Sequence, residues 1–265
     1  MLSDMSNRLT GVTSRVYSAA AYLAFAVITT WAVAFLANLP TVSGIDDASS
    51  GAAWVAVLVD SSLLLLFALQ HSVMARAGVK QRIARVVPAA SERSTYVLST
   101  SLCLGLIFWQ WRSLPASVWQ VDAQPWEALL WGICALGWAI ALGSTFMIDH
   151  LEFLGLRQGG WARHRPQTSS SFVESWMYAW LRHPMMLGLL IAFWATPSMS
   201  AGHLLFAAAS SGYIVVGVHF EERDLRRQLG EVYADYAQRV PRFVPRPPST
   251  VAAAALLAET EAGRS

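Results

Sequence analysis

Histidines and carboxylates gather in this sequence where long apolar stretches begin or end. A histidine exchanges protons near neutral pH, and an arginine can hold a carboxylate with two parallel hydrogen bonds. Collected at one depth, such groups could bind a ligand that carries a carboxylate together with hydroxyl or amino groups, and could take a proton from a substrate. Four sets stand at these positions: Gln70 and His71, Asp149 and His150, Arg182 and His183, and Glu221, Glu222 and Arg223.

Each set, taken alone, has an ordinary structural explanation. Polar and charged residues commonly anchor the ends of membrane helices by reaching toward water. Four sets on one side of a membrane need a common explanation, and a polar pocket between helix ends supplies one. Both interpretations depend on which elements carry the sets and on where those elements end.

The elements that carry these residues are apolar stretches. The chain has 265 residues, 55% hydrophobic and 14% charged, and its mean hydropathy is +0.41, which argues against a water-soluble globular domain. A helix needs about 20 residues to cross the hydrocarbon layer. The sequence predicts one domain, residues 1–265, that is an all-α polytopic transmembrane helical bundle with about six spans. The uncharged stretches are 16–36, 52–68 apart from Asp60, 96–111, 128–148, 184–196 and 203–220.

The fifth stretch is the short one, because it ends before Pro197. The uncharged residues 175–181 could lengthen it, or the bilayer could thin around a tight hairpin. Five full spans with one re-entrant hairpin are therefore an alternative to six. The first stretch is longer than the core of a signal peptide and is followed by further spans, so we expect it to stay as an anchor.

The distribution of basic residues predicts the orientation of the bundle. Among the 19 lysines and arginines, Arg112 alone falls in the odd-numbered connections 38–51, 112–127 and 197–202. The other 18 lie at the N-terminus, in the even-numbered connections and in the C-terminal segment. Because basic loops near span ends resist translocation, both termini and all four polar sets should face the cytoplasm.

The stretch "LRHPMMLG", residues 181–188, predicts a binding site at the start of a helix. Pro184 suits the first helical turn, where its missing N–H costs nothing, and fixes the direction of Arg182 and His183. The backbone donors there favour an anion. Because a tight turn joins the last two spans, Arg182 and His183 should lie near Glu221 and Glu222.

The chain after the last span should form an amphipathic helix and then an extended end. Residues 221–246 place Leu225, Leu229, Val232 and Tyr236 at helical spacing, and prolines follow from Pro241. We expect the Ala-rich tail, residues 250–265, to be poorly ordered. Cys103 and Cys134 have no Cys or His partner at ligand spacing, so neither a disulfide framework nor a metal site is expected.

The C-terminal part of the sequence resembles the isoprenylcysteine carboxyl methyltransferase superfamily of membrane enzymes. The resemblance rests on "RHPMMLG" and, about 35 residues later, on "EERDLRRQLGEVYADYAQRVPRFVP", although Met186 stands at the family's usual aromatic position. It implies S-adenosyl-L-methionine as cofactor and residues 178–246 as the cofactor-binding half. The implied cofactor-binding residues are Arg182, His183, Pro184, Gly188, Glu221, Glu222, Tyr236 and Arg239. A structural alternative pairs Glu222 with Arg226 one turn along the helix and leaves Arg239 in solvent.

Two further stretches, "LQHSVMAR" (69–76) and "DHLEFLGLRQ" (149–158), resemble the bacterial methanethiol S-methyltransferases, a branch related to NnrU proteins. This likeness implies methylation of methanethiol, a small volatile thiol, to dimethyl sulfide in a bacterial inner membrane. Since only a thiolate is a good nucleophile, a general base is useful, although the positive cofactor could make one dispensable. The candidate catalytic residues are His71 and His150, with Asp149 as an orienting group. The candidate substrate-binding residues are Arg157, Gln158 and Trp194.

Three of these residues also have structural alternatives. Arg157 and Gln158 could belong to a loop that is fastened to the lipid surface, and Trp194 could serve helix packing instead of a cation–π contact. Other acceptors also fit the sequence: an isoprenylcysteine carboxylate, a phospholipid amine or another small thiol. A non-catalytic NnrU-like accessory protein is a further alternative. Transport is disfavoured because Asp60 is the only ionisable residue well inside a span. We expect membrane lipid but no nucleic acid as a partner, and the oligomeric state is left open.

Overall fold

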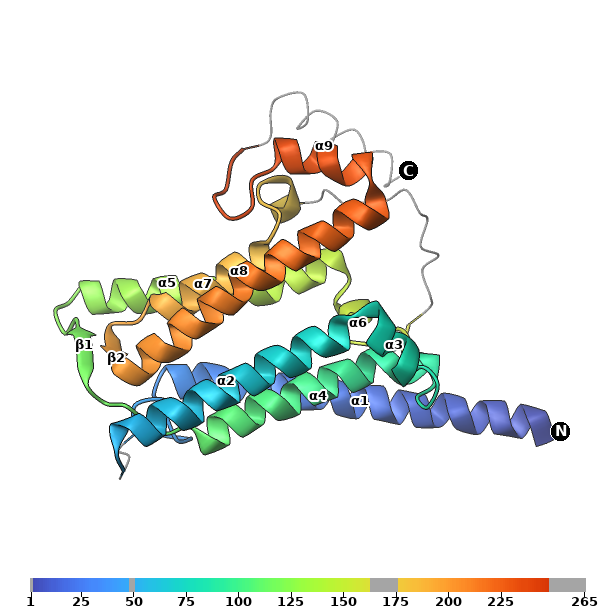
Figure 1. The fold of residues 1–265 in the computed structure, drawn as a ribbon, viewed down its shortest axis with the longest axis horizontal. Coiled ribbons are helices and arrows are strands. Elements are labelled where there is room, and N and C mark those ends of the chain that lie inside the picture. The colour runs from blue at the N-terminus through green and yellow to red at the C-terminus, as the bar shows by residue number, and fades with distance from the viewer. Residues whose placement is uncertain (1, 48–50, 163–175, 248–265) are drawn as a thin grey trace.

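A computed structural model describes residues 2–47, 51–162 and 176–247 and is mostly helical, which confirms the all-α polytopic prediction. Figure 1 shows one group of helices formed by α1, α2 and α4 and a second group formed by α5, α7 and α8. The elements are α1 (Leu2–Leu36), α2 (Ala53–Ala75), α3 (Ala77–Ile83), α4 (Ala89–Gln110), β1 (Ser117–Gln120), α5 (Trp126–Ile148), α6 (His150–Phe153), the 3-10 helix η1 (Trp176–Ala179), α7 (Pro184–Trp194), β2 (Ser198–Ser200), α8 (Ala201–Leu229) and α9 (Glu231–Arg239).

Helices occupy all six predicted apolar stretches, but their lengths differ. Within the described residues, four are long and apolar enough to cross a membrane, namely Gly11–Leu36 of α1 and the whole of α2, α5 and α8. The helix α4 has 22 residues, and α7 has only 11, or about 16 Å of helix. The break between η1 and Pro184 prevents residues 176–181 from lengthening α7 as one helix. The structure thus favours five long helices and one short one.

The short helix α7 is held by a close crossing with α5. A Cβ atom added at Gly188 would lie 2.5 Å from the backbone nitrogen of Ala141, and one added at Gly137 would lie 2.6 Å from the nitrogen of Ala192. Small residues let membrane helices approach backbone to backbone, where dispersion contacts stabilise the pair. Gly188, predicted to give room to a cofactor, therefore lies in a helix crossing.

The two groups of helices meet in an aromatic core and at a small sheet. Phe35 and Phe108 of the first group pack with Phe193 and Phe206 of the second. At that end of the bundle β1 pairs antiparallel with β2, a pairing that the loop sequences did not predict. Asp60 is buried nearby and accepts a hydrogen bond from the backbone nitrogen of Arg112 at 2.9 Å, consistent with an interhelical role.

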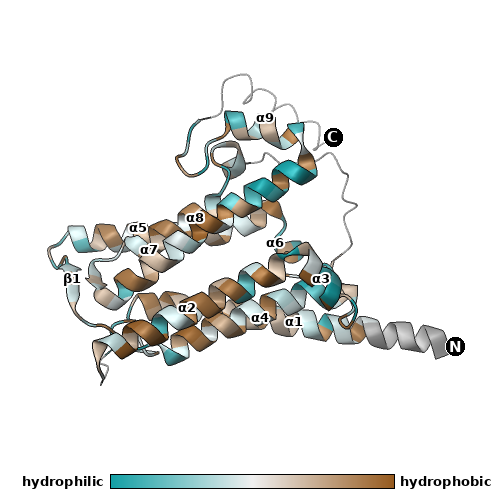
Figure 2. Ribbon diagram, in the orientation of Figure 1, coloured by the Kyte–Doolittle hydropathy of each residue, from teal (hydrophilic) through white to brown (hydrophobic). Residues whose placement is uncertain are grey.

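The opposite end of the bundle carries the polar residues. The 29 residues of α8 span about 43 Å, more than the roughly 30 Å hydrocarbon layer, so the last turns of α8 extend beyond it. Figure 2 shows hydrophilic residues at this end of α8 and at α3. The amphipathic helix predicted after residue 221 is divided, because Gly230 adopts a φ of +56° between α8 and α9. The tail predicted for residues 250–265 lies outside the described residues.

Candidate functional site

The start of α7 and the end of α8 form a charged cluster, which we call the clamp: Arg182, His183, Glu222 and Arg242. Arg182 Nη1 lies 3.0 Å from Glu222 Oε1, and His183 Nε2 lies 3.2 Å from the same oxygen. Pro184 is the first residue of α7, as predicted. The predicted proximity of the RHP and EE motifs is therefore confirmed.

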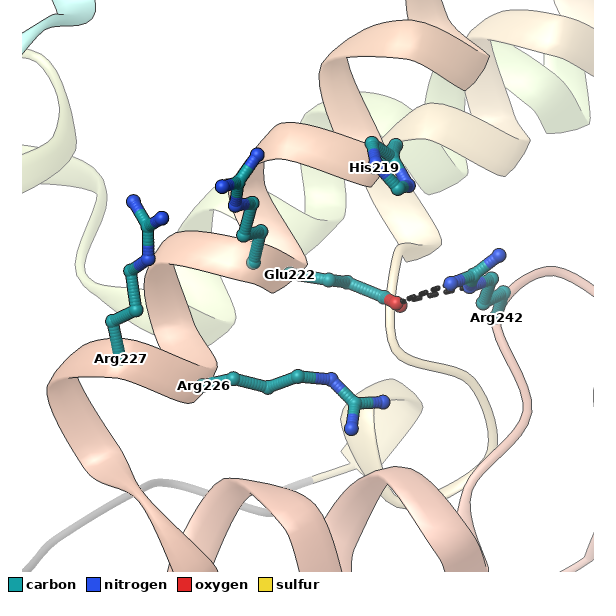
Figure 3. Close-up of a pocket in the computed structure, with 6 residues that line it drawn as sticks. His219, Glu222, Arg226, Arg227 and Arg242 are labelled. Carbon is teal, nitrogen blue, oxygen red and sulfur yellow. Dashed lines mark hydrogen bonds and ion pairs between the residues drawn. The ribbon is translucent and has the colours of Figure 1, made fainter.

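The segment after α9 closes the clamp, and sequence reasoning missed its contribution. Arg242 donates from Nε at 3.0 Å and from Nη2 at 2.7 Å to Glu222 Oε2, which raises the pKa of Arg242 (Figure 3). The backbone nitrogens of Arg182 and His183 donate to the carbonyls of Pro241 at 2.9 Å and Arg242 at 3.3 Å. An arginine directly after Pro241 was the available signal, but only the fold brings it to Glu222.

Both oxygens of Glu222 are therefore engaged inside the protein. Its side chain is only 3% exposed, and its carboxylate is held by Arg182, His183 and Arg242. These partners replace the pairing with Arg226 that was the alternative. A carboxylate in contact with these three side chains is positioned to hold α7, α8 and the C-terminal segment together.

The neighbouring Glu221 is open. Its side chain is 51% exposed, and its Oε2 lies 3.7 Å from Nδ1 of His183. Burial and the Glu221 carboxylate raise the pKa of Tyr178 to about 12, so Tyr178 stays a neutral phenol. Glu221 is the acidic group beside the clamp that a ligand can reach.

Arg182 has unused donor capacity in the same place. Its side chain is 8% exposed, and its Nε has no hydrogen-bond partner within the part of the chain that the structure describes. A buried N–H without a partner is costly, so an added acceptor would stabilise this site.

Tyr236 is buried and donates its hydroxyl to the carbonyl of Tyr178 at 2.8 Å, which fixes α9 against η1. Arg239 lies in the last turn of α9.

His150 makes its hydrogen bonds to neutral hydroxyl groups, and the charge of Asp149 opposes the effect of burial on the pKa of His150. The Thr145 hydroxyl donates to the Leu142 carbonyl, so it accepts from His150 Nδ1 at 2.7 Å, and Nε2 is left to accept from Tyr22 at 3.2 Å. Phe146 stacks on the imidazole with ring centroids 4.0 Å apart. Burial lowers the pKa of His150, which keeps the ring neutral at pH 7.

Asp149 fastens the loop that follows α5. Its Oδ2 lies 2.5 Å from Arg157 Nη2, and its Oδ1 accepts from the backbone nitrogen of Glu152 at 3.0 Å, capping α6. This loop packs on α4, where Arg93 donates to the Phe153 carbonyl at 2.7 Å. Arg157 and Gln158 therefore lie in a packed loop, and the Oε1 atom of Gln158 is buried without a described partner.

His71 lies among aromatic residues between α2, α4 and α8. Its Nε2 lies 2.7 Å from the Tyr96 hydroxyl and its Nδ1 lies 3.3 Å from Thr100 Oγ1. Phe67 stacks on the ring, and Tyr213 meets it edge-on. As with His150, both ring nitrogens face hydroxyl groups instead of carboxylates.

The fold brings the sets at Arg182 and Glu221 into direct contact, places His150 toward the start of α7, and leaves His71 and Trp194 apart. Gly137 meets Ala192 and Ala141 meets Gly188 where α5 and α7 cross, so Thr145, which holds His150, lies toward the start of α7. His71 lies opposite Tyr213, nine residues or about 13 Å before Glu222 along α8. Trp194 ends α7, about 16 Å from the clamp, and donates to Ser211 at 2.9 Å.

Comparison with known proteins gives the relatives of this chain. A relative from Mycobacterium tuberculosis named methanethiol S-methyltransferase is 48% identical over 233 residues, covering 88% of this chain and 96% of the relative. One from Bradyrhizobium diazoefficiens named methanethiol S-methyltransferase 2 is 49% identical and covers 87% and 89%. One from a Pseudomonas species, also named methanethiol S-methyltransferase, is 44% identical and covers 91% and 92%. No solved structure matches the chain.

The match to a protein family covers the whole candidate site. The family model described as NnrU protein matches residues 61–242. This range includes His71, His150, the loop after α5 and the complete clamp up to Arg242. With relatives of this similarity over nearly their full length, the chain belongs to the NnrU family, in the branch that the methanethiol S-methyltransferases form.

Proposed function

We propose that this protein transfers a methyl group from S-adenosyl-L-methionine to methanethiol, giving dimethyl sulfide and S-adenosylhomocysteine, at the cytoplasmic face of a bacterial inner membrane. The substrate is suggested by the names of relatives that cover nearly the whole chain. The site is placed beside the clamp because of two groups there: the buried Nε of Arg182, which has no partner among the described residues, and the half-exposed carboxylate of Glu221.

These two groups fit the cofactor chemically. An amino-acid carboxylate would accept from Nε of Arg182, and Glu221 would accept from ammonium or hydroxyl donors while its charge favours a cationic ligand. When bound, S-adenosyl-L-methionine supplies a methyl carbon that its sulfonium has already activated. Gly188, Pro184 and Tyr236 act indirectly, because they fix α7 and η1 around the binding groups.

The protein's part in the reaction is to align the thiol sulfur and to accept its proton. A small thiol is mostly protonated at neutral pH, and the thiolate is the nucleophile. We assign the proton to Nε2 of His150, which is the nitrogen that accepts a hydrogen bond. After protonation, the Tyr22 hydroxyl would turn from donor to acceptor, so that Nε2–H keeps a partner. Bound S-adenosyl-L-methionine would supply the activated methyl carbon, and the residues of the site would align the thiolate sulfur behind it.

His150 is preferred over His71 because of its position. Thr145, whose hydroxyl holds His150, lies one turn along α5 from Ala141, which meets Gly188 near the start of α7. His71 lies further from the clamp, beside Tyr213 of α8.

Trp194 is too far along α7 to contact a substrate at the clamp, so we assign it to helix packing. We assign Arg157 and Gln158 to the wall of the site.

The experiment that tests the function measures dimethyl sulfide by headspace gas chromatography. Detergent-purified protein receives S-adenosyl-L-methionine and methanethiol, and cofactor binding is measured separately by titration calorimetry. Wild-type protein should produce dimethyl sulfide, Glu221→Gln should lose most of it, and Glu231→Gln on α9 serves as the matched control. Binding without product would show that the acceptor is wrong, and no binding would reject the methyltransferase assignment.

A further inference from the structure

A cavity outside the cofactor-binding groups proposed above borders Glu222. An open cavity of about 450 Å³ is formed at the end of α8 and the segment after α9. Figure 3 shows Arg226 and Arg242 extending toward the same space from these two elements. The lining residues are His219, Glu222, Arg223, Arg226, Arg227 and Arg242.

The charges of this cavity select for an anion. Four guanidinium groups line it, and the single lining carboxylate, Glu222, is already shared with Arg182, His183 and Arg242. Arg227 lies 3.7 Å from Asp224, but both side chains are at least half exposed, so this pair is weak. A cationic ligand would be repelled here, whereas beside Glu221 it would be attracted.

The cavity lies next to the apolar, exposed surface of α8. On the spanning helix α8, Val215 and Val216 are 57% and 53% exposed, as lipid-facing residues are. His219 and Arg223 follow on the same face at intervals of four residues. The apolar face of α8 therefore leads directly to the arginines at the depth where hydrocarbon gives way to headgroups.

We propose that this cavity binds the phosphate of an anionic phospholipid headgroup, with the acyl chains along Val215 and Val216. Arginine holds phosphate with parallel hydrogen bonds, and each basic side chain near an anionic lipid surface contributes roughly fivefold in affinity. Arg242 is fixed by Glu222 before any ligand arrives, so less conformational entropy is lost on binding. The site holds lipid as a stabilising ligand, separate from the methyl-transfer chemistry.

The test measures lipid binding by native mass spectrometry of the full-length protein in detergent, with phosphatidylglycerol and phosphatidylcholine of the same chain length. The wild type should retain phosphatidylglycerol in preference to phosphatidylcholine. Arg223→Gln combined with Arg226→Gln should weaken phosphatidylglycerol binding about 30-fold, since two arginines are removed. Arg223→Lys combined with Arg226→Lys should restore most of the binding, which separates loss of charge from misfolding.

A matched control removes two charges elsewhere at the same end of the bundle. Lys80→Gln combined with Arg82→Gln on α3 should leave phosphatidylglycerol binding unchanged. Equal retention of the two lipids, or equal weakening by the α3 and α8 variants, would overturn the proposal. Displacement of phosphatidylglycerol by an equal concentration of inorganic phosphate would also overturn it, because the site would then recognise a free anion instead of a lipid.

Discussion

The clamp and the loop region that contains His150 hold polar side chains in opposite ways. In the clamp, two arginines and a histidine surround Glu222, so the contacts depend on charge. His150 is held by two hydroxyls and a stacked ring, so its contacts are neutral. The clamp therefore fixes helices through charged contacts, whereas the hydroxyl groups around His150 leave its imidazole neutral and able to accept a proton.

The largest expected effect is a difference in stability between variants of the two adjacent glutamates, Glu221 and Glu222. Glu222→Gln removes the carboxylate that compensates Arg182, and breaking a buried ion pair in this way costs about 3–5 kcal/mol. Glu221→Gln changes a half-exposed side chain, so it should cost less than about 0.5 kcal/mol. Thermal unfolding of both variants in the same detergent measures the difference, and equal midpoints would contradict the structural role assigned to Glu222.

The next prediction compares the two histidines. His150→Gln should lower kcat about 100-fold, the usual contribution of a general base, with little change in cofactor affinity. His71→Gln should alter kcat far less, because His71 lies deeper in the bundle beside Tyr213. The measurement is initial-rate kinetics at saturating methanethiol. A larger loss of kcat in the His71 variant would assign the role of general base to the pair formed by His71 and Tyr96.

Sequence reasoning predicted the membrane bundle and the contact between Arg182 and Glu222 because both depend on local pattern. Apolar stretches, Pro184 at a helix start and a tight turn between two helices are sufficient to place the two motifs at one depth. The break at Gly230 was not predicted, since the apolar spacing continues across it while the backbone changes direction.

The partners of the histidines could not be predicted from sequence. Tyr22 and Tyr96 lie within helices and are ordinary residues there, and only helix packing brings them to His150 and His71. The same holds for Gly188: its motif position suggested room for a ligand, whereas the neighbouring backbone of Ala141 occupies that room. Long-range packing decides which motif residues face a site.

A smaller effect is expected on cofactor affinity. Glu221→Gln keeps the shape of the side chain but removes its charge, and a hydrogen bond to a charged group contributes about 1.5–3 kcal/mol. The Kd for S-adenosyl-L-methionine should therefore rise at least about tenfold. Titration calorimetry measures it, with Glu231→Gln as a control for loss of charge. An unchanged Kd would place the cofactor away from Glu221.

The smallest expected effect is on the pH dependence of stability. Burial lowers the pKa of His150 below its ordinary value of 6.5, so between the two pKa values the unfolded chain binds a proton that the folded chain does not. The free energy of unfolding of the protein should therefore decrease as the pH falls below about 6.5. Thermal unfolding of the wild type should decline there more steeply than that of His150→Gln. Parallel pH profiles would mean that the folded protein and the unfolded chain bind the proton of His150 equally well, which would contradict a pKa lowered by burial.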